Sequence, residues 1–415
     1  MNLTIAEKIL SRTSGKKASA GELVVAKIDA AMTHDGNAKL TIKAFQEMGG
    51  RKVWDPNRIA IVIDHVAPSA SETISVVHQT MREFAAVQKI RNFYDIGSGV
   101  CHQLMPEMGF VNTGSLVVGT DSHTCTYGAL GAFATGIGST EMAAVFISGK
   151  LWFKVPETIK LNITGNLKPS VTPKDLILHI IGKIKADGAT YKALEFTGPT
   201  ITEMSIDGRM TLCNMAVEMG AKTGIIAPDQ KTTRFLKGRV KSPIKPLKSD
   251  PHAEYEEIIE FEVGGLEPQV ACPHFVDNVK PVSDVKGIEI DQVFLGSCTN
   301  GRLEDLRAAA KILKRNKISP NVRMIVIPAS KEVYNAALKE GLIEIFIKSG
   351  CLVCNPGCGP CAGAHEGILA SGEIALSTSN RNFPGRMGST EAQIYLVSPM
   401  TAAVSALNGK ITSPK

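Results

Sequence analysis

Three cysteines in the last third of the chain occur in short motifs that can bind a metal centre. Cys298 follows a run of apolar residues, whereas Cys358 and Cys361 form a Cys-x-x-Cys pair further along the chain. Three thiolates can hold three irons of a [4Fe–4S] cluster and leave the fourth iron open to a substrate. An open iron acts as a Lewis acid rather than as an electron carrier. The three cysteines therefore predict one [4Fe–4S] cluster with a chemical role.

Two other kinds of metal site are compatible with the cysteine spacing. Cys351 and Cys354 add a second Cys-x-x-Cys pair, which together with Cys358 and Cys361 could bind a structural zinc ion in a zinc-stabilised binding protein. Cys354, Cys358 and Cys361 also have the spacing of the radical enzymes that cleave S-adenosylmethionine. Too few residues follow Cys361 for the barrel that those enzymes build, so this alternative is disfavoured. The zinc alternative stays open.

Histidines and aspartates outside the cysteine region form a second group of candidate residues. Asp64 and His65 follow one apolar run, Asp121 and His123 follow another, and His102 lies between them in the sequence. Carboxylates orient imidazoles and shift their pKa values, which suits proton transfer near neutral pH. A departing hydroxyl group needs such a proton, because hydroxide is a poor leaving group. We therefore predict that these residues act together in proton transfer.

Two arginines indicate the charge of the substrate. Arg381 and Arg386 lie in a turn-rich segment that follows an apolar run at residues 374–377. A guanidinium group stays charged and binds a carboxylate through two parallel hydrogen bonds. Two such groups close to the cysteines predict a dicarboxylate or tricarboxylate ligand.

The candidate residues follow apolar segments that alternate with helical ones. Strands are predicted at residues 58–63, 115–118, 158–163, 292–295, 323–327 and 374–377, and helices at residues 303–314 and 331–339. Such alternation predicts an α/β fold with mostly parallel sheets. In these sheets, functional side chains gather beyond the carboxyl ends of the strands. One site could therefore contain the aspartates, the histidines and Cys298.

Composition limits the class of protein. A chain of 415 residues, of which 44% are hydrophobic, is long enough for two or three domains. Nine cysteines are an odd number and cluster unevenly, which favours metal binding in a reducing compartment, and we expect the cytoplasm. We expect neither a signal peptide nor a membrane span. The net charge of +6 is small, and the basic segment at residues 237–248 has no interleaved aromatic residues, so we expect no nucleic-acid partner.

Six short strings of residues together resemble the aconitase superfamily. They cover nearly the whole chain in a consistent order, and their combination is far more specific than any one of them. The strings are Ile63-Asp64-His65, Gly99 to Gln103, Gly119 to Thr124, Ser297 to Asn300, Cys358-Gly359-Pro360-Cys361, and Asn380 to Phe383 with Gly385-Arg386.

The resemblance implies a role for each matching residue. It implies three α/β/α lobes, at residues 1–153, 154–284 and 285–415, around a central cluster site. The implied cluster ligands are Cys298, Cys358 and Cys361, with Asn300 and Asn380 beside the cluster. The implied proton- and water-handling residues are Asp64, His65, His102, Asp121, His123 and Glu195. The implied substrate-binding residues are Arg381, Arg386, Ser122 and His34, the last of which stands where single-chain aconitases carry a glutamine.

The resemblance also implies a partner and a substrate class. Single-chain aconitases continue into a swivelling fourth domain, so a separate small subunit is expected to supply that domain here. The length is similar to that of the large subunit of two-subunit 3-isopropylmalate dehydratases, which are hydro-lyases of leucine biosynthesis. Homoaconitate hydratase and the dimethylmalate and citramalate dehydratases stay open as alternatives.

Overall fold

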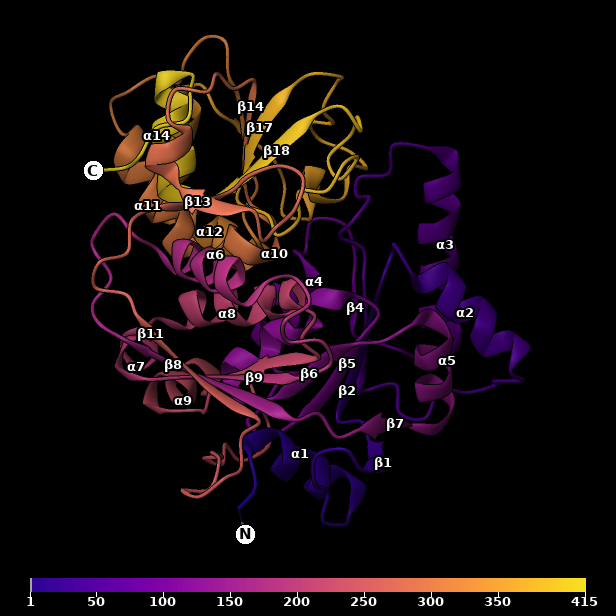
Figure 1. The fold of residues 1–415 in the computed structure, drawn as a ribbon. Coiled ribbons are helices and arrows are strands. Elements are labelled where there is room, and N and C mark those ends of the chain that lie inside the picture. Colours follow the sequence, from indigo (N-terminus) through magenta and orange to yellow (C-terminus); the bar gives the residue numbers. More distant parts are fainter. Residues whose placement is uncertain (1) are drawn as a thin grey trace.

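The computed structural model describes residues 2–415, in which the strands form four sheets (Figure 1). The first large sheet has five parallel strands in the order β4-β3-β2-β5-β6. Their bounds are β2 Ala30–His34, β3 Ile59–Val62, β4 Phe93–Tyr94, β5 Leu116–Gly119 and β6 Phe133–Gly136. The surrounding helices are α2 Ala38–Glu47, α3 Glu72–Val87, α4 Cys101–Glu107, η1 Ser122–Leu130 and α5 Ser139–Ser148.

Both faces of this first sheet are buried, as expected of a parallel sheet. Ile59 and Ile61 pack in one core with residues of α2, α3 and α5, whereas Ala60 and Val62 pack in another with residues of α4. The second core also contains residues of the next sheet, such as Leu161. The first two lobes therefore share apolar packing, which fixes their relative position.

The second sheet has four parallel strands in the order β10-β9-β8-β11. Its strands are β8 Thr158–Thr164, β9 Ala193–Thr197, β10 Thr223–Ile225 and β11 Glu257–Glu262. Its helices are α6 Pro173–Ile184, α7 Pro199–Glu203, α8 Ile206–Asn214, η2 Met215–Met219 and α9 Gln230–Leu236. The basic segment at residues 237–248 follows α9 and contains neither helix nor strand.

The third sheet has seven strands in the order β13-β12-β18-β17-β14-β15-β16. The strands from β18 to β16 are parallel, and β12 and β13 add an antiparallel edge. The strands are β12 Gln269–Ala271, β13 Val279–Pro281, β14 Gln292–Leu295, β15 Arg323–Val326, β16 Leu352–Val353, β17 Ile374–Ser377 and β18 Gln393–Val397. The helices are η3 Val282–Val285, α10 Ser297–Asn300, α11 Leu303–Leu313, α12 Lys331–Lys339, α13 Leu342–Ser349, η4 Gly359–Ala362 and α14 Pro399–Asn408.

A small antiparallel ribbon completes the strands, formed by β1 (Leu23–Lys27) and β7 (Lys150–Lys154) beside the N-terminal helix α1 (Ile5–Ser14). Thr4 and Glu7 form a capping box at the start of α1, and Gly15 ends it with φ of 76°. This pattern satisfies backbone groups at both helix ends.

The predicted strands and helices all occur within one or two residues of their expected bounds. The α/β fold class is therefore confirmed. The lobe boundaries near residues 153 and 284 remain predictions, and the pairing of β12 with β18 adds residues from Gln269 onward to the third sheet. Among the described residues, no helix combines the length and the apolar character of a membrane-spanning segment.

The lobes meet where strands end. Asp64 follows β3, and its carbonyl oxygen accepts a hydrogen bond of 2.7 Å from the backbone N–H of Cys358. Gly99 forms an isolated bridge with Ser330, which precedes α12. These contacts bring the carboxyl ends of the first and third sheets together, with the third lobe (orange to yellow) beside the first (indigo to purple) in Figure 1.

Adjacent residues of α13 test how much the third-lobe core contributes to stability. Phe346 is fully buried, whereas Ile347 is 60% exposed. We expect Phe346→Ala to lower the free energy of unfolding by about 3–5 kcal/mol, because removing the ring leaves a cavity. The matched control Ile347→Ala should change it by no more than about 0.5 kcal/mol. Urea denaturation followed by circular dichroism measures the free energy of unfolding of both variants. An equal decrease in the two variants would contradict the assignment of Phe346 to the core.

Candidate active site

The three predicted ligand cysteines lie together beyond the carboxyl ends of third-lobe strands. Cys298 is in α10, directly after β14, and Cys361 is in η4, after β16. Both are close to the side chain of Asn380. Cys298, Cys358 and Cys361 are 5%, 3% and 1% exposed, and all three are free thiols. The fold therefore gathers three buried sulfurs from two distant segments of the chain.

Backbone geometry explains the small residues in both cysteine motifs. Ser297 has φ of 72°, which turns the chain sharply between β14 and Cys298. Gly359, between the two paired cysteines, has φ of 60°, and a Cβ atom there would lie 2.2 Å from Cδ1 of Ile327. A side chain at position 359 would therefore be strained at this φ and would have to displace the end of the Ile327 side chain.

Nitrogen donors surround the sulfur atoms. The Nδ2 atoms of Asn214 and Asn380 donate to Cys298 Sγ at 3.3 and 3.5 Å, and Arg386 Nη2 donates to Cys361 Sγ at 3.3 Å. Burial, followed by the charge of Cys361, raises the pKa of Cys298 to about 12. A thiolate at Cys298 therefore needs these donors and a bound cation. The donor set fits an iron–sulfur cluster, whose thiolate ligands accept N–H hydrogen bonds.

The four-cysteine zinc alternative does not fit this geometry. Cys351 packs in the apolar core of the third lobe, and Cys354 is only partly buried beside a different core. Zinc would require four sulfurs within about 4 Å of one another. Among the described residues, the donors that lie within 4.8 Å of one another belong to His34, Asp35, Asp64 and His65, and that group includes no cysteine.

The predicted histidines and aspartates form one buried hydrogen-bonded network. Asp64 Oδ1 is 2.8 Å from His65 Nδ1, and Asp64 Oδ2 accepts the backbone N–H of Cys101 at 2.6 Å. His102 contacts the hydroxyl of Tyr127 at 3.0 Å through Nδ1. Asp64 is thereby fixed at the end of its strand while it orients the imidazole of His65.

Asp121 connects the histidines to one another. Its Oδ1 lies 2.7 Å from His102 Nε2 and 3.3 Å from His123 Nδ1. Its Oδ2 lies 3.9 Å from His65 Nε2 and 4.0 Å from His34 Nε2. Burial acts to raise the pKa of Asp121, but the hydrogen bonds with His102 and His123 lower it well below its usual range. A single half-buried anion therefore lies within 4.0 Å of four imidazoles.

Two stacked histidines differ in protonation. The rings of His34 and His65 are stacked with centroids 3.9 Å apart. Burial and the charge of His65 lower the pKa of His34 to about 4. Burial also acts to lower the pKa of His65, but the charge and hydrogen bond of Asp64 outweigh it and raise that pKa to about 10. Between these values His65 is a cation and His34 is neutral, so the pair carries one positive charge.

The other two histidines also shift in opposite directions. Burial lowers the pKa of His102, and the hydrogen bond with Asp121 offsets only part of that effect. Burial acts in the same direction on His123, but hydrogen bonds with Asp121 and Glu218 raise its pKa overall. Two groups whose pKa values shift in opposite directions are suited to separate acid and base roles.

Arg381 lies at the edge of this network. Its Nε donates to both carboxylate oxygens of Glu218, at 3.0 and 3.1 Å, and its Nη2 donates to Ser122 Oγ at 3.0 Å. Glu218 in turn is 2.7 Å from His123 Nε2. The predicted substrate-binding residues Arg381 and Ser122 are therefore in contact with each other and with the histidine network.

The remaining predicted residues line the cysteine side of the site. Arg386 is partly exposed, and its guanidinium lies 5.7 Å from the centre of the Phe383 ring. Asn300 donates to Asp305 Oδ1 at 2.9 Å. The Oδ1 atom of Asn300 and the Nε atom of Arg386 are buried and have no hydrogen-bond partner. Unpaired buried polar atoms are costly, so these two fit a site built to hold a further group.

Glu195 is not brought to the site, and the structure corrects this expectation. It lies on β9 and accepts hydrogen bonds from Ser249 Oγ at 2.7 Å and Tyr255 Oη at 3.3 Å, so it serves the loop that follows residue 248. The carboxylate that contacts His123 and Arg381 is Glu218, in η2. No local signal marks Glu218, because it lies between apolar residues in the short 3₁₀ helix η2.

A buried arginine joins the cysteine segment to the histidine segment. Arg302 is 1% exposed and donates to the carbonyl oxygens of Cys298 at 2.6 Å and Thr299 at 2.7 Å. Its Nε donates to Gln103 Oε1 at 3.0 Å. Because Gln103 follows His102 in α4, the cysteine and the histidine are held at fixed relative positions.

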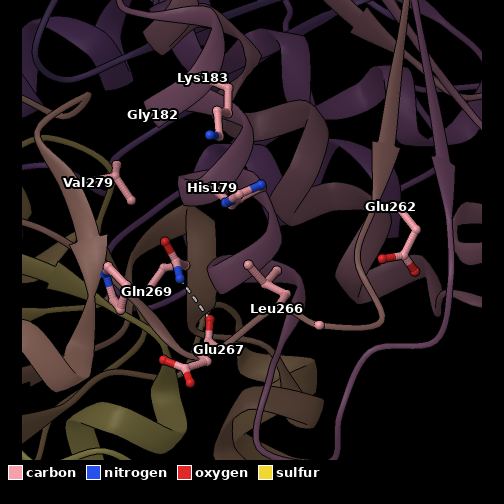
Figure 2. Close-up of a pocket in the computed structure, with 10 residues that line it drawn as sticks. His179, Gly182, Lys183, Glu262, Leu266, Glu267, Gln269 and Val279 are labelled. Carbon is pink, nitrogen blue, oxygen red and sulfur yellow. Dashed lines mark hydrogen bonds between the residues drawn. The ribbon is translucent and has the colours of Figure 1, made fainter.

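An open pocket of about 500 Å³ lies elsewhere, along α6 (Figure 2). His179 and Lys183, one turn apart on that helix, line it together with Glu262, Glu267 and Val279. It contains none of the predicted site residues. The buried network, rather than this pocket, is therefore the candidate active site.

Comparison with known proteins identifies the family. The model of the aconitase family (aconitate hydratase) matches residues 7–287 and 279–409. The chain belongs to the aconitase family. The family predicted from the sequence is therefore confirmed.

Several relatives match the chain over all or nearly all of its length. It is 59% identical over 415 residues to a probable 3-isopropylmalate dehydratase large subunit of Methanothermobacter thermautotrophicus, covering 100% of this chain and 99% of the relative. It is 56% identical over 392 residues to a probable methanogen homoaconitase large subunit of Methanosarcina mazei, covering 94% of this chain and 100% of the relative. The solved structure of Thermococcus kodakaraensis aconitase X is 13% identical, with a TM-score of 0.50, and covers 94% of this chain and 98% of that one.

The raised pKa of His65 predicts a pH-dependent contribution to stability. A raised pKa stabilises the fold fully below the ordinary value of 6.5, and this stabilisation is lost as the pH rises to about 10. We expect His65→Gln to reduce the free energy of unfolding most near pH 6 and progressively less toward pH 10. Denaturation at several pH values measures this, with His252→Gln in an exposed loop as control. A pH-independent loss would contradict the prediction.

Proposed function

We propose that the chain is the large, cluster-bearing subunit of a hydro-lyase that removes water from a hydroxy dicarboxylate or tricarboxylate and adds it back. The favoured activity is that of 3-isopropylmalate dehydratase in leucine biosynthesis. One observation carries the proposal: three buried cysteines, four histidines linked by Asp121, and Arg381 meet in one site. The relatives named as large subunits match over the full length of this chain, which favours an enzyme made of a large and a small subunit.

Cys298, Cys358 and Cys361 would hold the cluster. When bound, a [4Fe–4S] cluster with one open iron supplies a Lewis acid for the departure of a hydroxyl group. Asn214, Asn380 and Arg386 would keep the cysteine sulfurs oriented and charged, because their N–H groups already point at two of them. The nine free cysteines favour a reducing compartment, and we place the enzyme in the cytoplasm.

The arginines and histidines would divide the remaining work. Arg381 and Arg386 would bind substrate carboxylates, with Ser122, Asn300 and His34 beside them. His102, oriented by Asp121, would transfer a proton to the departing hydroxyl group. His65 with Asp64, and His123, carry raised pKa values and would keep positive charge beside Asp121, so that this aspartate stays ionised and orients His102. Glu218 would take the role that the resemblance implies for Glu195.

A separate small subunit would complete the enzyme. We propose that it supplies the base that removes a proton from the adjacent carbon, since the first-lobe network provides groups for the oxygen side of the reaction. When the hydroxyl group leaves one carbon and water then adds its hydroxyl group to the neighbouring carbon, the net result is isomerisation. Homoaconitate hydratase is the second candidate because relatives of this chain at 50–56% identity carry that name. Dimethylmalate and citramalate dehydratases use the same chemistry.

Assay of the two-subunit complex tests the proposal. We expect the chain, purified without oxygen with its small subunit, to contain iron and sulfide and to hydrate or dehydrate members of a panel of hydroxy dicarboxylates and tricarboxylates. Cys298→Ser should abolish visible absorbance and turnover, because one of three cluster ligands is lost. Zinc in place of iron, or normal turnover by Cys298→Ser, would overturn the proposal.

Replacement of Arg381 tests carboxylate binding separately. We expect Arg381→Lys to raise KM about tenfold to a hundredfold, because a lysine cannot form the two parallel hydrogen bonds of a guanidinium. The cluster absorbance should stay unchanged, since no cysteine contact is altered. Arg307→Lys, at an exposed ion pair with Glu340, is the control. Unchanged KM at Arg381→Lys would exclude the assigned role.

A further inference from the structure

Lys174 is a fully buried lysine at the start of α6 in the second lobe. Lysine is almost never completely buried unless its charge is compensated. The helix begins with Thr172 and Asp175 in a capping box and with Pro173 in its first turn. Other residues therefore form the hydrogen bonds that the backbone needs at the start of this helix. The ammonium group of Lys174 extends away from the capping box toward the third lobe.

The ammonium group contacts the segment that carries two site residues. Lys174 Nζ donates to the carbonyl oxygen of Thr378 at 2.8 Å and to that of Ser379. These carbonyls come after β17 and directly before Asn380 and Arg381. Asn380 donates to Cys298 Sγ, and Arg381 pairs with Glu218. A side chain from the second lobe thus holds the backbone that orients a sulfur contact and a predicted substrate contact.

No carboxylate among residues 2–415 forms an ion pair with Lys174. The anionic groups that favour its charged form are Asp305, Cys361, Asp175 and Cys298, while burial lowers its pKa to about 7. A buried cation without a paired anion is destabilising. Two of the groups that compensate it electrostatically are predicted cluster ligands, so its charge is best accommodated when the cysteine site is anionic.

We infer that Lys174 is a positioning residue, which anchors the Asn380–Arg381 segment through Thr378 and Ser379 and supplies positive charge behind the three-cysteine site. The electrostatic part rests on the proposed function, because it needs a cluster held by thiolates. The anchoring part depends only on the hydrogen bonds of this chain.

Two measurable effects follow from this role. Loss of the two hydrogen bonds frees residues 378–381, so Arg381 is no longer held in place and KM rises while cluster content is retained. Loss of a buried positive charge makes addition of an electron to a nearby cluster less favourable. The reduction potential of the cluster therefore shifts to a more negative value.

The experiment compares three variants of the two-subunit complex. Lys174→Met removes both the donors and the charge, Lys174→Gln keeps an N–H donor without the charge, and Lys183→Met alters an exposed lysine of the same helix. We expect Lys174→Met to raise KM about tenfold and to lower the reduction potential measured by redox titration with electron paramagnetic resonance. Lys174→Gln should lower the potential similarly with a smaller rise in KM, and Lys183→Met should change neither.

A second measurement keeps the anchoring part testable without the cluster. Hydrogen exchange of residues 378–386 in the isolated chain should be faster in Lys174→Met than in wild type and in Lys183→Met. If wild type contains no iron but this exchange difference appears, the proposed function fails and the anchor stands. The inference would be overturned if both Lys174 variants showed the hydrogen exchange, the KM and the cluster reduction potential of wild type. A Lys174→Met chain that unfolds while Lys174→Gln retains the KM and potential of wild type would overturn it as well.

Discussion

Burial of charge at the meeting point of the three lobes is the constraint on which the rest of this structure depends. Asp121 is an anion within 4.0 Å of four imidazoles, Arg302 is a cation with 1% exposure, and the amine of Lys174 is fully buried. Charges removed from water are stable only when hydrogen bonds and opposite charges surround them. Each lobe therefore supplies groups that would be unfavourable in isolation and that become compensated when the lobes pack together.

This constraint explains why the sheets are arranged as they are. The polar groups lie on residues that directly follow short parallel strands, which are buried on both faces. These strands are β3, β5, β14 and β17. Their backbones are held by contacts such as the one from Cys358 N–H to the Asp64 carbonyl. The apolar cores provide the free energy that the buried polar network requires, and the network in turn fixes how the cores face each other.

The α/β fold class and six of the strands could be predicted from the sequence, because these strands are apolar runs and several site residues directly follow them. Cys298, Asp64 and Asp121 were found in this way. Glu218 and Lys174 were not, since they lie on or next to helices and their neighbours in the sequence give no sign of what they contact. The family resemblance implies a site role for Glu195, but only the fold shows that its side chain meets Ser249 and Tyr255. Local patterns identify strand ends well, whereas contacts between lobes depend on packing that no local pattern records.

The hydrogen bond from Asn214 to Cys298 has a consequence for biogenesis. Asn214 belongs to the second lobe and the sulfur to the third, and the Cys358 backbone is bonded to the first. A fragment that carried all three cysteines would still lack these supports. In the proposed enzyme, these supports would exist only after the three sheets have packed together, so insertion of the cluster would follow folding rather than nucleate it.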